Sequence, residues 1–134
     1  MTSGSILDSS ALIAYMNDEP GGPLVSQALA QGTAMSVVNW AEVISKFVGW
    51  GEDPDQFIAR FSAQPSLRNG VRFVPMVAAD SIQIAKLWPF ARAHNLSLGD
   101  RACLALGLRL GLPVLHAEHR WLGLDIGIRL HNIR

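Results

Sequence analysis

Short apolar segments alternate with longer amphipathic segments along the chain, and this alternation limits the possible folds more than any other feature. The apolar segments, which we predict to be strands, cover residues 5–8, 34–37, 71–74, 114–115 and about 128–130. Apolar residues recur at helical spacing over residues 11–15, 24–30, 39–48, 54–63, 78–94 and 99–110. Strands that alternate with helices form parallel sheets covered on both faces. We therefore predict a three-layer α/β/α sandwich around a parallel sheet of four to five strands.

The predicted helices begin at residues with side chains suited to capping. Ser9 and Ser10 precede the first helix, Asn39 the third, Asp53 the fourth and Ser97 the last. Pro89 is expected to interrupt the helix predicted over residues 78–94.

Composition limits the class of protein. The 134 residues are 49% hydrophobic and 16% charged, which excludes intrinsic disorder and is enough to form one domain over residues 1–134. The single cysteine, Cys103, excludes an internal disulfide and fits a reducing compartment. The N-terminal residues lack the charge and apolar run of a signal peptide, and Pro, Gly and polar residues break the charge-free stretch 20–41. We expect a soluble, cytoplasmic protein without a membrane partner.

Charge is balanced in number and unevenly placed. Lys46 is the only base among residues 1–56, where seven acids lie, whereas the rest of the chain has ten bases and four acids. Such asymmetry is typical of proteins with charged partners and indicates an acidic cluster in a basic surface. Nine of the bases are arginines, which suit bidentate phosphate contacts. Arg101 and Arg120 are the preferred candidates for substrate contact, and a solvated position on a helix face is the alternative for each.

Four acids occur at junctions between the predicted elements. Asp8 and Glu118 follow strands, and Glu42 and Asp100 lie in the first turns of helices. In a parallel sheet these positions face the edge where ligands bind. Clustered carboxylates repel one another unless a cation lies among them, and an all-oxygen donor set favours Mg²⁺ or Mn²⁺. Such a site suits phosphodiester hydrolysis. An acid in the first turn of a helix, as predicted for Glu42 and Asp100, also fits the simpler role of a partner for the helix dipole.

The strings around these acids resemble those of the PIN-domain ribonucleases, in particular the VapC toxins of toxin–antitoxin pairs. ILDSSALIAYMNDEPG is similar to the opening strand and first catalytic Asp, SVVNWAEVISK to the second motif and LSLGDRACLALGLRLGLPVL to the third. VLHAEHRW is similar to the fourth motif, with a departure. The family usually has leucine, threonine, alanine and aspartate there, whereas this chain has Leu115, His116, Ala117 and Glu118.

The resemblance implies metal-dependent cleavage of RNA by water, leaving a 3′-hydroxyl and a 5′-phosphate. Asp8, Glu42 and Asp100 take the catalytic and metal-binding roles, and Glu118 joins them if its longer side chain reaches the ion. His116 and Ser10 are candidates for substrate contact, although a structural His116 is an equal alternative. The resemblance also implies a VapB-like antitoxin and a homodimer.

Other roles stay open for several residues. Ser10, Ser36 and Asn39 either donate hydrogen bonds to the acids or cap helices. We expect the tryptophans to be core or interface anchors and Cys103 to pack as a small apolar residue. Two alternative functions remain at this stage: a binding module that has lost catalysis, which the altered fourth motif favours, and a phosphatase or phosphotransfer domain.

Overall fold

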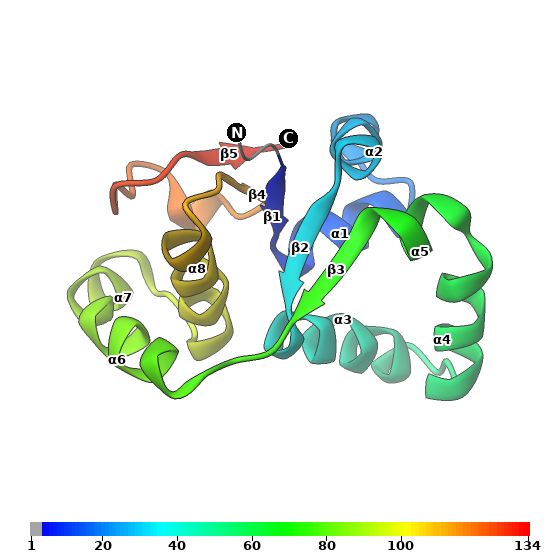
Figure 1. Ribbon diagram of the computed structural model, residues 1–134, viewed down its shortest axis with the longest axis horizontal. Helices are drawn as coiled ribbons and strands as arrows, with labels where there is room; N and C mark the ends of the chain where they lie inside the picture. The colour runs from blue at the N-terminus through cyan, green and yellow to red at the C-terminus, as the bar shows by residue number, and fades with distance from the viewer. Residues whose placement is uncertain (1–3) are drawn as a thin grey trace.

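The computed structural model describes residues 4–134, which form a parallel sheet of five strands between two groups of helices (Figure 1). The strands lie in the order β3-β2-β1-β4-β5, and every neighbouring pair is parallel. Their bounds are β1 (Ser5–Leu7), β2 (Thr33–Ser36), β3 (Val71–Val74), β4 (Val114–His116) and β5 (Leu130–Asn132). The predicted α/β/α sandwich with four to five strands is confirmed.

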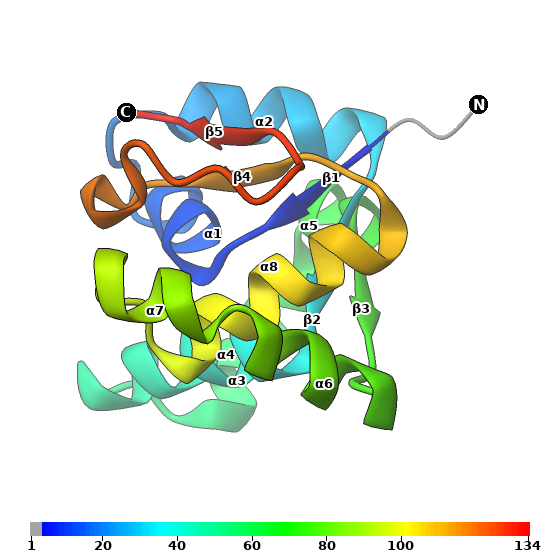
Figure 2. The same ribbon diagram turned by 90° about the vertical axis from the view of Figure 1, so that its left-hand side faces the viewer.

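Alternate residues of the strands face two separate hydrophobic cores. Leu7 and Met35 belong to the core beneath α1 (Ser9–Met16), α2 (Gly22–Gln31), α3 (Val37–Gly49), α4 (Pro54–Ala63) and α5 (Pro65–Gly70). Ile6 and Ala34 belong to the opposite core, which includes residues of α7 (Trp88–His94), α8 (Leu98–Leu110) and the short helix η1 (His119–Trp121). Helix α6 (Ala78–Lys86) packs against α8 on that same face, as Figure 2 shows. Both faces of the sheet are therefore covered, as a parallel sheet requires.

Two helix starts differ from the prediction. Asp8, and not residues 9–10, caps α1, because its side chain accepts a hydrogen bond from the Ser10 N–H. Ser36, and not Asn39, caps α3, because its hydroxyl accepts from the N–H groups of Val38 and Asn39. Both corrections have one cause: each helix begins directly at the end of a strand, so the last strand residue or the one after it becomes the cap.

The remaining bounds agree with the prediction more closely. Asp53 and Ser97 cap α4 and α8 as expected. The helix predicted over residues 78–94 is divided at Leu87, with Pro89 in the first turn of the second part. Helix α5 is unexpected, and β5 begins at Leu130, two residues later than the start predicted from the sequence.

The order of the strands creates a switch point between β1 and β4. The chain moves from β1 through β2 to β3 on one side and then returns to place β4 and β5 on the other. Ligands of such sheets bind beyond the carboxyl ends of the strands at this point. Asp8 lies there, with its N–H donating to the Leu115 carbonyl at 3.0 Å. No helix within residues 4–134 has the length and apolar character needed to cross a membrane.

Candidate metal and nuclease site

We call the group Asp8, Glu42, Asp100 and Glu118 at the carboxyl ends of the strands the acid edge. Asp8 lies at its centre and is 1% exposed. Its Oδ2 accepts hydrogen bonds from the Ser10 hydroxyl at 2.5 Å and the Ser10 N–H at 3.2 Å. Its Oδ1 is also buried and has no hydrogen-bond partner among the described residues. One carboxylate oxygen is thus held in place while the other is left for a ligand.

The surroundings of Asp8 favour a neutral carboxyl or an added cation. Burial raises the pKa of Asp8 to about 7, and the nearby charges of Asp100 and Glu118 act in the same direction against the lowering effect of Ser10. The pKa of the buried Cys103 thiol is likewise raised, first by burial and then by Asp8, Asp100 and Glu42. Three acids therefore surround one buried thiol, which behaves as the expected small apolar residue and not as a nucleophile.

Asp100 is fixed at the start of α8. Its Oδ2 accepts from the Ser97 N–H at 2.9 Å, and the Asp100 N–H donates to the Ser97 hydroxyl at 3.0 Å, which together form a capping box. The same Oδ2 accepts from Nη1 of Arg120 at 3.1 Å. Arg120 also pairs with Glu118 at 3.1 Å and donates to the Asn95 carbonyl. This arginine therefore links two of the four acids, and it lies beside the site where the sequence placed it as a candidate for substrate contact.

Glu42 lies beyond the first turn of α3, and not within it as predicted, because the helix begins earlier, at Val37. It is held by hydrogen bonds from α3 itself and from α1. Its Oε1 accepts from Nδ2 of Asn39 at 2.8 Å and from the Ser9 hydroxyl at 3.3 Å. Nδ2 of the fully buried Asn39 also donates to the Gly99 carbonyl at 3.0 Å, which joins α3 to α8. A Cβ at Gly99 would lie 2.2 Å from Oε2 of Glu42, so any side chain at position 99 would displace the Glu42 carboxylate. Sequence reasoning missed Gly99, because the contact spans 57 positions.

The fourth motif positions Glu118 through His116. The Glu118 N–H donates to Nδ1 of His116 at 3.1 Å, and the imidazole packs on Trp121 with ring centroids 4.5 Å apart. His116 is 3% exposed, and burial together with the charge of His131 lowers its pKa to about 4. A buried neutral ring with an occupied Nδ1 favours a structural role for His116 over substrate contact.

Ser10 joins the first and fourth motifs. Its hydroxyl donates to Asp8, and it accepts from the Ala117 N–H at 3.0 Å. Ser10 therefore combines a donor role with its place in the first turn of α1. Asn39 also donates to an acid, whereas Ser36 only caps a helix.

The predicted basic surface is less concentrated than expected. The guanidinium of Arg101 lies over the Trp88 ring at 5.4 Å and donates to the Ile84 carbonyl, so it contacts α6 and α7 and not the acids. Arg109 pairs with Asp80, and Arg72 lies at the opposite edge of the sheet. Arg120 is the arginine that this geometry places among the acids. Of the tryptophans expected to be core or interface anchors, Trp121 is buried and Trp40 packs against the core, whereas Trp50 and Trp88 are 60% and 56% exposed.

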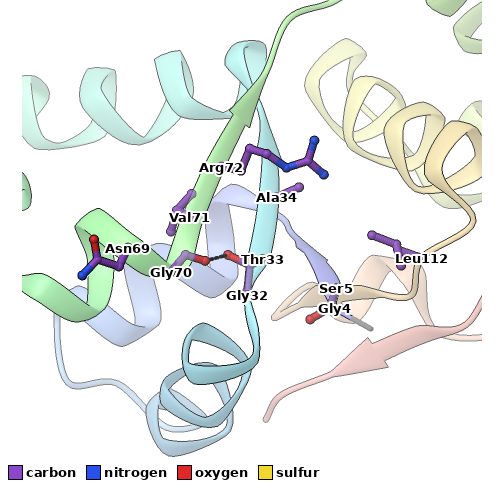
Figure 3. Close-up of a pocket in the computed structure, with 10 residues that line it drawn as sticks. All are labelled: Gly4, Ser5, Gly32, Thr33, Ala34, Asn69, Gly70, Val71, Arg72 and Leu112. Carbon is purple, nitrogen blue, oxygen red and sulfur yellow. Dashed lines mark hydrogen bonds between the residues drawn. The ribbon is translucent and has the colours of Figure 1, made fainter. Parts of the chain in front are cut away.

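At the other end of the sheet, which we call the amino edge, lies a hollow. It has a volume of about 240 Å³ and is lined by the first residues of three strands, Ser5, Thr33 and Val71, as Figure 3 shows. Glycines and backbone carbonyls surround these residues, and none of the described residues that line the hollow is an acid. The Thr33 hydroxyl donates to the Gly70 carbonyl at 2.7 Å. The described lining of the amino edge therefore differs from the acid edge in having no carboxylate to bind a metal ion.

The acid edge offers a donor set for a hard divalent cation. Asp8 Oδ1 accepts no hydrogen bond within residues 4–134, and the neighbouring acids supply negative charge. Within the described part of the chain, however, no three His, Cys, Asp or Glu side chains are close enough together to hold one ion. Mg²⁺ commonly binds one or two carboxylates and keeps water for its other positions. The residues present therefore fit a magnesium-type ion with few direct protein ligands.

Comparisons with known proteins identify the family and the fold. No curated protein matches the chain. Among solved structures, the chain is similar to VapBC-1 from nontypeable Haemophilus influenzae, with a TM-score of 0.73, 17% identity and 98% of each chain covered. DNA-bound VapBC from Salmonella typhimurium has a TM-score of 0.72 and 14% identity, with 99% of this chain and 100% of that chain covered. The PIN domain family matches residues 5–126, which is most of the chain, and the chain therefore belongs to the PIN domain family.

Proposed function

We propose that the protein is a metal-dependent endoribonuclease that cleaves RNA at the acid edge. The observation that carries the proposal is the buried Oδ1 of Asp8, which lacks a hydrogen-bond partner within residues 4–134 and lies beside the charges of Asp100 and Glu118. An unpartnered buried carboxylate oxygen is costly unless a cation binds it. Membership of the PIN domain family supports the same function, since the resemblance of the motifs implies a ribonuclease.

The residues of the acid edge divide the work. Asp8 and Asp100 would hold Mg²⁺ or Mn²⁺, which supplies charge stabilisation and an activated water when bound. Glu42, fixed by Asn39 and Ser9, would orient water, and Glu118 would bind the ion or a water. Ser10 keeps Oδ2 of Asp8 turned away from the ligand position. Arg120 holds Asp100 and Glu118 at a fixed spacing and offers a guanidinium at the acid edge for a substrate phosphate.

We further propose that the protein acts as the toxin of a toxin–antitoxin pair, with a VapB-like antitoxin as partner and a homodimer as its own assembly. The support is the similarity of the fold to VapBC structures, including VapBC2 from Rickettsia felis, described as bound to a DNA fragment from its promoter. That similarity has a TM-score of 0.72 at 11% identity over 97% of this chain and 98% of that one. Growth arrest on expression of the wild-type chain, absent for Asp100→Asn, is the expected result.

A second candidate is a PIN-fold module that binds RNA or protein without cleaving it. The observation in its favour is Arg120, whose ion pairs with Asp100 and Glu118 already provide one positive charge at the acid edge. The structure offers no comparable support for phosphotransfer, because none of the ion pairs formed by residues 4–134 joins a lysine to Asp8.

Cleavage of labelled single-stranded RNA by the purified chain tests the proposal. We expect cleavage with Mg²⁺ or Mn²⁺ and none with a chelator, and a loss of at least about 100-fold for Asp8→Asn and Asp100→Asn. Arg72→Gln, at the amino edge, is the matched control and should cleave normally. A wild-type chain that binds RNA but cleaves none with either metal would support the binding module instead.

A further inference from the structure

Two hollows meet at the C-terminal end of α3, and the same two side chains line both. One hollow, of about 530 Å³, follows the outer face of α3 from Val38 to Trp50. The other, of about 300 Å³, extends past Ser10 to Glu118 at the acid edge. Lys46 and Trp50 line each of them. A ligand that follows α3 past Glu42 would therefore pass these two residues before it reaches Glu118.

Trp50 is exposed and yet held in place. Its indole is 60% exposed and packs edge-to-face on the buried ring of Phe47, with ring centroids 5.2 Å apart and an angle of 83°. The backbone N–H of Trp50 donates to the Lys46 carbonyl at 3.1 Å, at the end of α3. A large aromatic surface that is fixed and accessible favours stacking with a planar group.

Lys46 supplies an ammonium at the junction of the two hollows, where Glu42 and Glu118 also line the walls. It is the only base among residues 1–56. The ion pairs formed by residues 4–134 do not include it. The other cation in the hollow, Arg134, pairs with Glu19 at 2.5 Å. The ammonium of Lys46 is therefore available to an anionic ligand one helical turn from Trp50.

We propose that Trp50 and Lys46 form a subsite for one nucleotide of single-stranded RNA next to the bond that is cleaved. The base stacks on the indole of Trp50, and the ammonium of Lys46 contacts a phosphate. An aromatic platform beside a cation is the combination that binds single strands without strong sequence preference. The inference rests on the proposed function, because the acid edge must act on RNA for this hollow to lead substrate to it.

The chain contains its own controls for this proposal. Lys86 is its only other lysine, and Trp88 is its other exposed tryptophan, on the opposite side of the sheet. The probe is a fluorescein-labelled single-stranded RNA of mixed sequence, and binding is measured by fluorescence anisotropy in the Asp100→Asn background, which prevents cleavage. Thermal unfolding of each variant verifies that it is folded.

Trp50→Ala should weaken binding about tenfold, and Trp88→Ala should leave the affinity unchanged. Lys46→Gln should lower the slope of log affinity against log salt concentration by about 0.7, whereas Lys86→Gln should not alter it. Equal affinities for Trp50→Ala and Trp88→Ala would overturn the subsite. A change of oligomeric state in Trp50→Ala, measured by sedimentation and with RNA affinity intact, would also overturn it and assign this surface to protein contact. Failure of the wild-type chain to cleave any RNA would instead overturn the proposed function.

Discussion

The two edges of the sheet are built from the same strands and have opposite chemistry. The acid edge brings the charges of Asp100 and Glu118 near Oδ1 of Asp8, which has no hydrogen-bond partner within residues 4–134, whereas the amino edge presents glycines and backbone groups around a hollow of about 240 Å³. Both edges have space for a small molecule. The difference shows that convergent charged groups, and not the size of a hollow, identify the site that can do chemistry.

Helix direction explains this difference. Helices α1, α3 and α8 begin at the acid edge, and their caps are Asp8, Ser36 and Ser97. Helix N-termini carry unpaired N–H groups and partial positive charge, which stabilise acids placed beside them. Helices α2 and α8 end at Gly32 and Gly111, toward the amino edge, where carbonyl groups dominate. Anionic side chains are therefore favoured at one edge and disfavoured at the other.

The largest expected contrast between the edges comes from two glycine substitutions. Gly99→Ala places a Cβ 2.2 Å from Oε2 of Glu42, so this flexible side chain must move. We expect RNA cleavage to fall about 100-fold with little loss of stability, because small displacements of catalytic groups are costly for rate. Gly70→Ala places a Cβ 2.8 Å from the Leu29 carbonyl, a backbone atom. It should cost about 2 kcal/mol of stability and leave the activity of the folded protein unchanged.

Cleavage assays and thermal unfolding of both variants separate the two effects. Full activity in Gly99→Ala would remove Glu42 from the proposed site. Reduced activity in folded Gly70→Ala would show that the amino edge also affects catalysis.

The next contrast concerns the stability of the metal-free protein. The pKa of Asp8 is raised from 3.8 to about 7 in the folded state. The contribution of Asp8 to the free energy of unfolding is therefore complete below pH 4, where the carboxyl is protonated in both states, and is lost as pH rises through 7. Asp8→Asn carries no charge and avoids this loss. At pH 8 with a chelator, it should therefore be more stable than the wild-type chain, by roughly 2 kcal/mol.

Thermal unfolding at pH 5 and pH 8 measures this difference. His116 has the opposite dependence, since its pKa is lowered from 6.5 to about 4 and its contribution is lost as pH falls. That effect is shared by both proteins and cancels when they are compared. Asp80→Asn, which loses the ion pair of a buried aspartate with Arg109, is the control and should be destabilised at pH 8. An Asp8→Asn protein less stable than wild type at pH 8 would contradict the interpretation of Asp8.

A smaller effect is expected when the internal cation of the acid edge is removed. Arg120→Gln deletes a positive charge 3.1 Å from both Asp100 and Glu118, so a divalent cation meets less repulsion. We expect Mn²⁺ affinity, measured by calorimetry, to rise about fivefold at low salt and less at high salt, because Arg120 is partly exposed. Arg109→Gln, far from the acid edge, should leave Mn²⁺ affinity unchanged. Weaker binding in Arg120→Gln would mean that the arginine positions the ligands more than it competes with the ion.

Local signals predicted the acids, and long-range contacts determined how they are held. Asp8 could be identified because it follows a short apolar strand and precedes a helix, and Asp100 because Ser97 stands three residues before it. The bond from Asn39 to the Gly99 carbonyl joins residues 60 positions apart, which no local pattern encodes.

Burial was hardest to predict for polar and aromatic side chains. His116 is buried against Trp121, and Trp50 is exposed, although both lie in apolar sequence surroundings. The exposure of each depends on which face of a strand or helix its neighbours cover, and this is decided by packing. The sequence predicted that the sheet is parallel but not the order of its strands. The junctions between elements that carry Asp8 and Asp100 were evident from the sequence.

The smallest expected contrast compares one hydroxyl at each edge. Thr33→Val removes the 2.7 Å hydrogen bond to the Gly70 carbonyl, which should cost about 1 kcal/mol and leave cleavage unchanged. Ser10→Ala removes the hydroxyl that donates to Asp8 and accepts from the Ala117 N–H, so it should lower cleavage as well as stability. Denaturant unfolding and cleavage rates of the two variants are measured side by side. Equal cleavage in both would show that the hydroxyl of Ser10 is structural only, because the carboxylate of Asp8 would then keep its orientation without it.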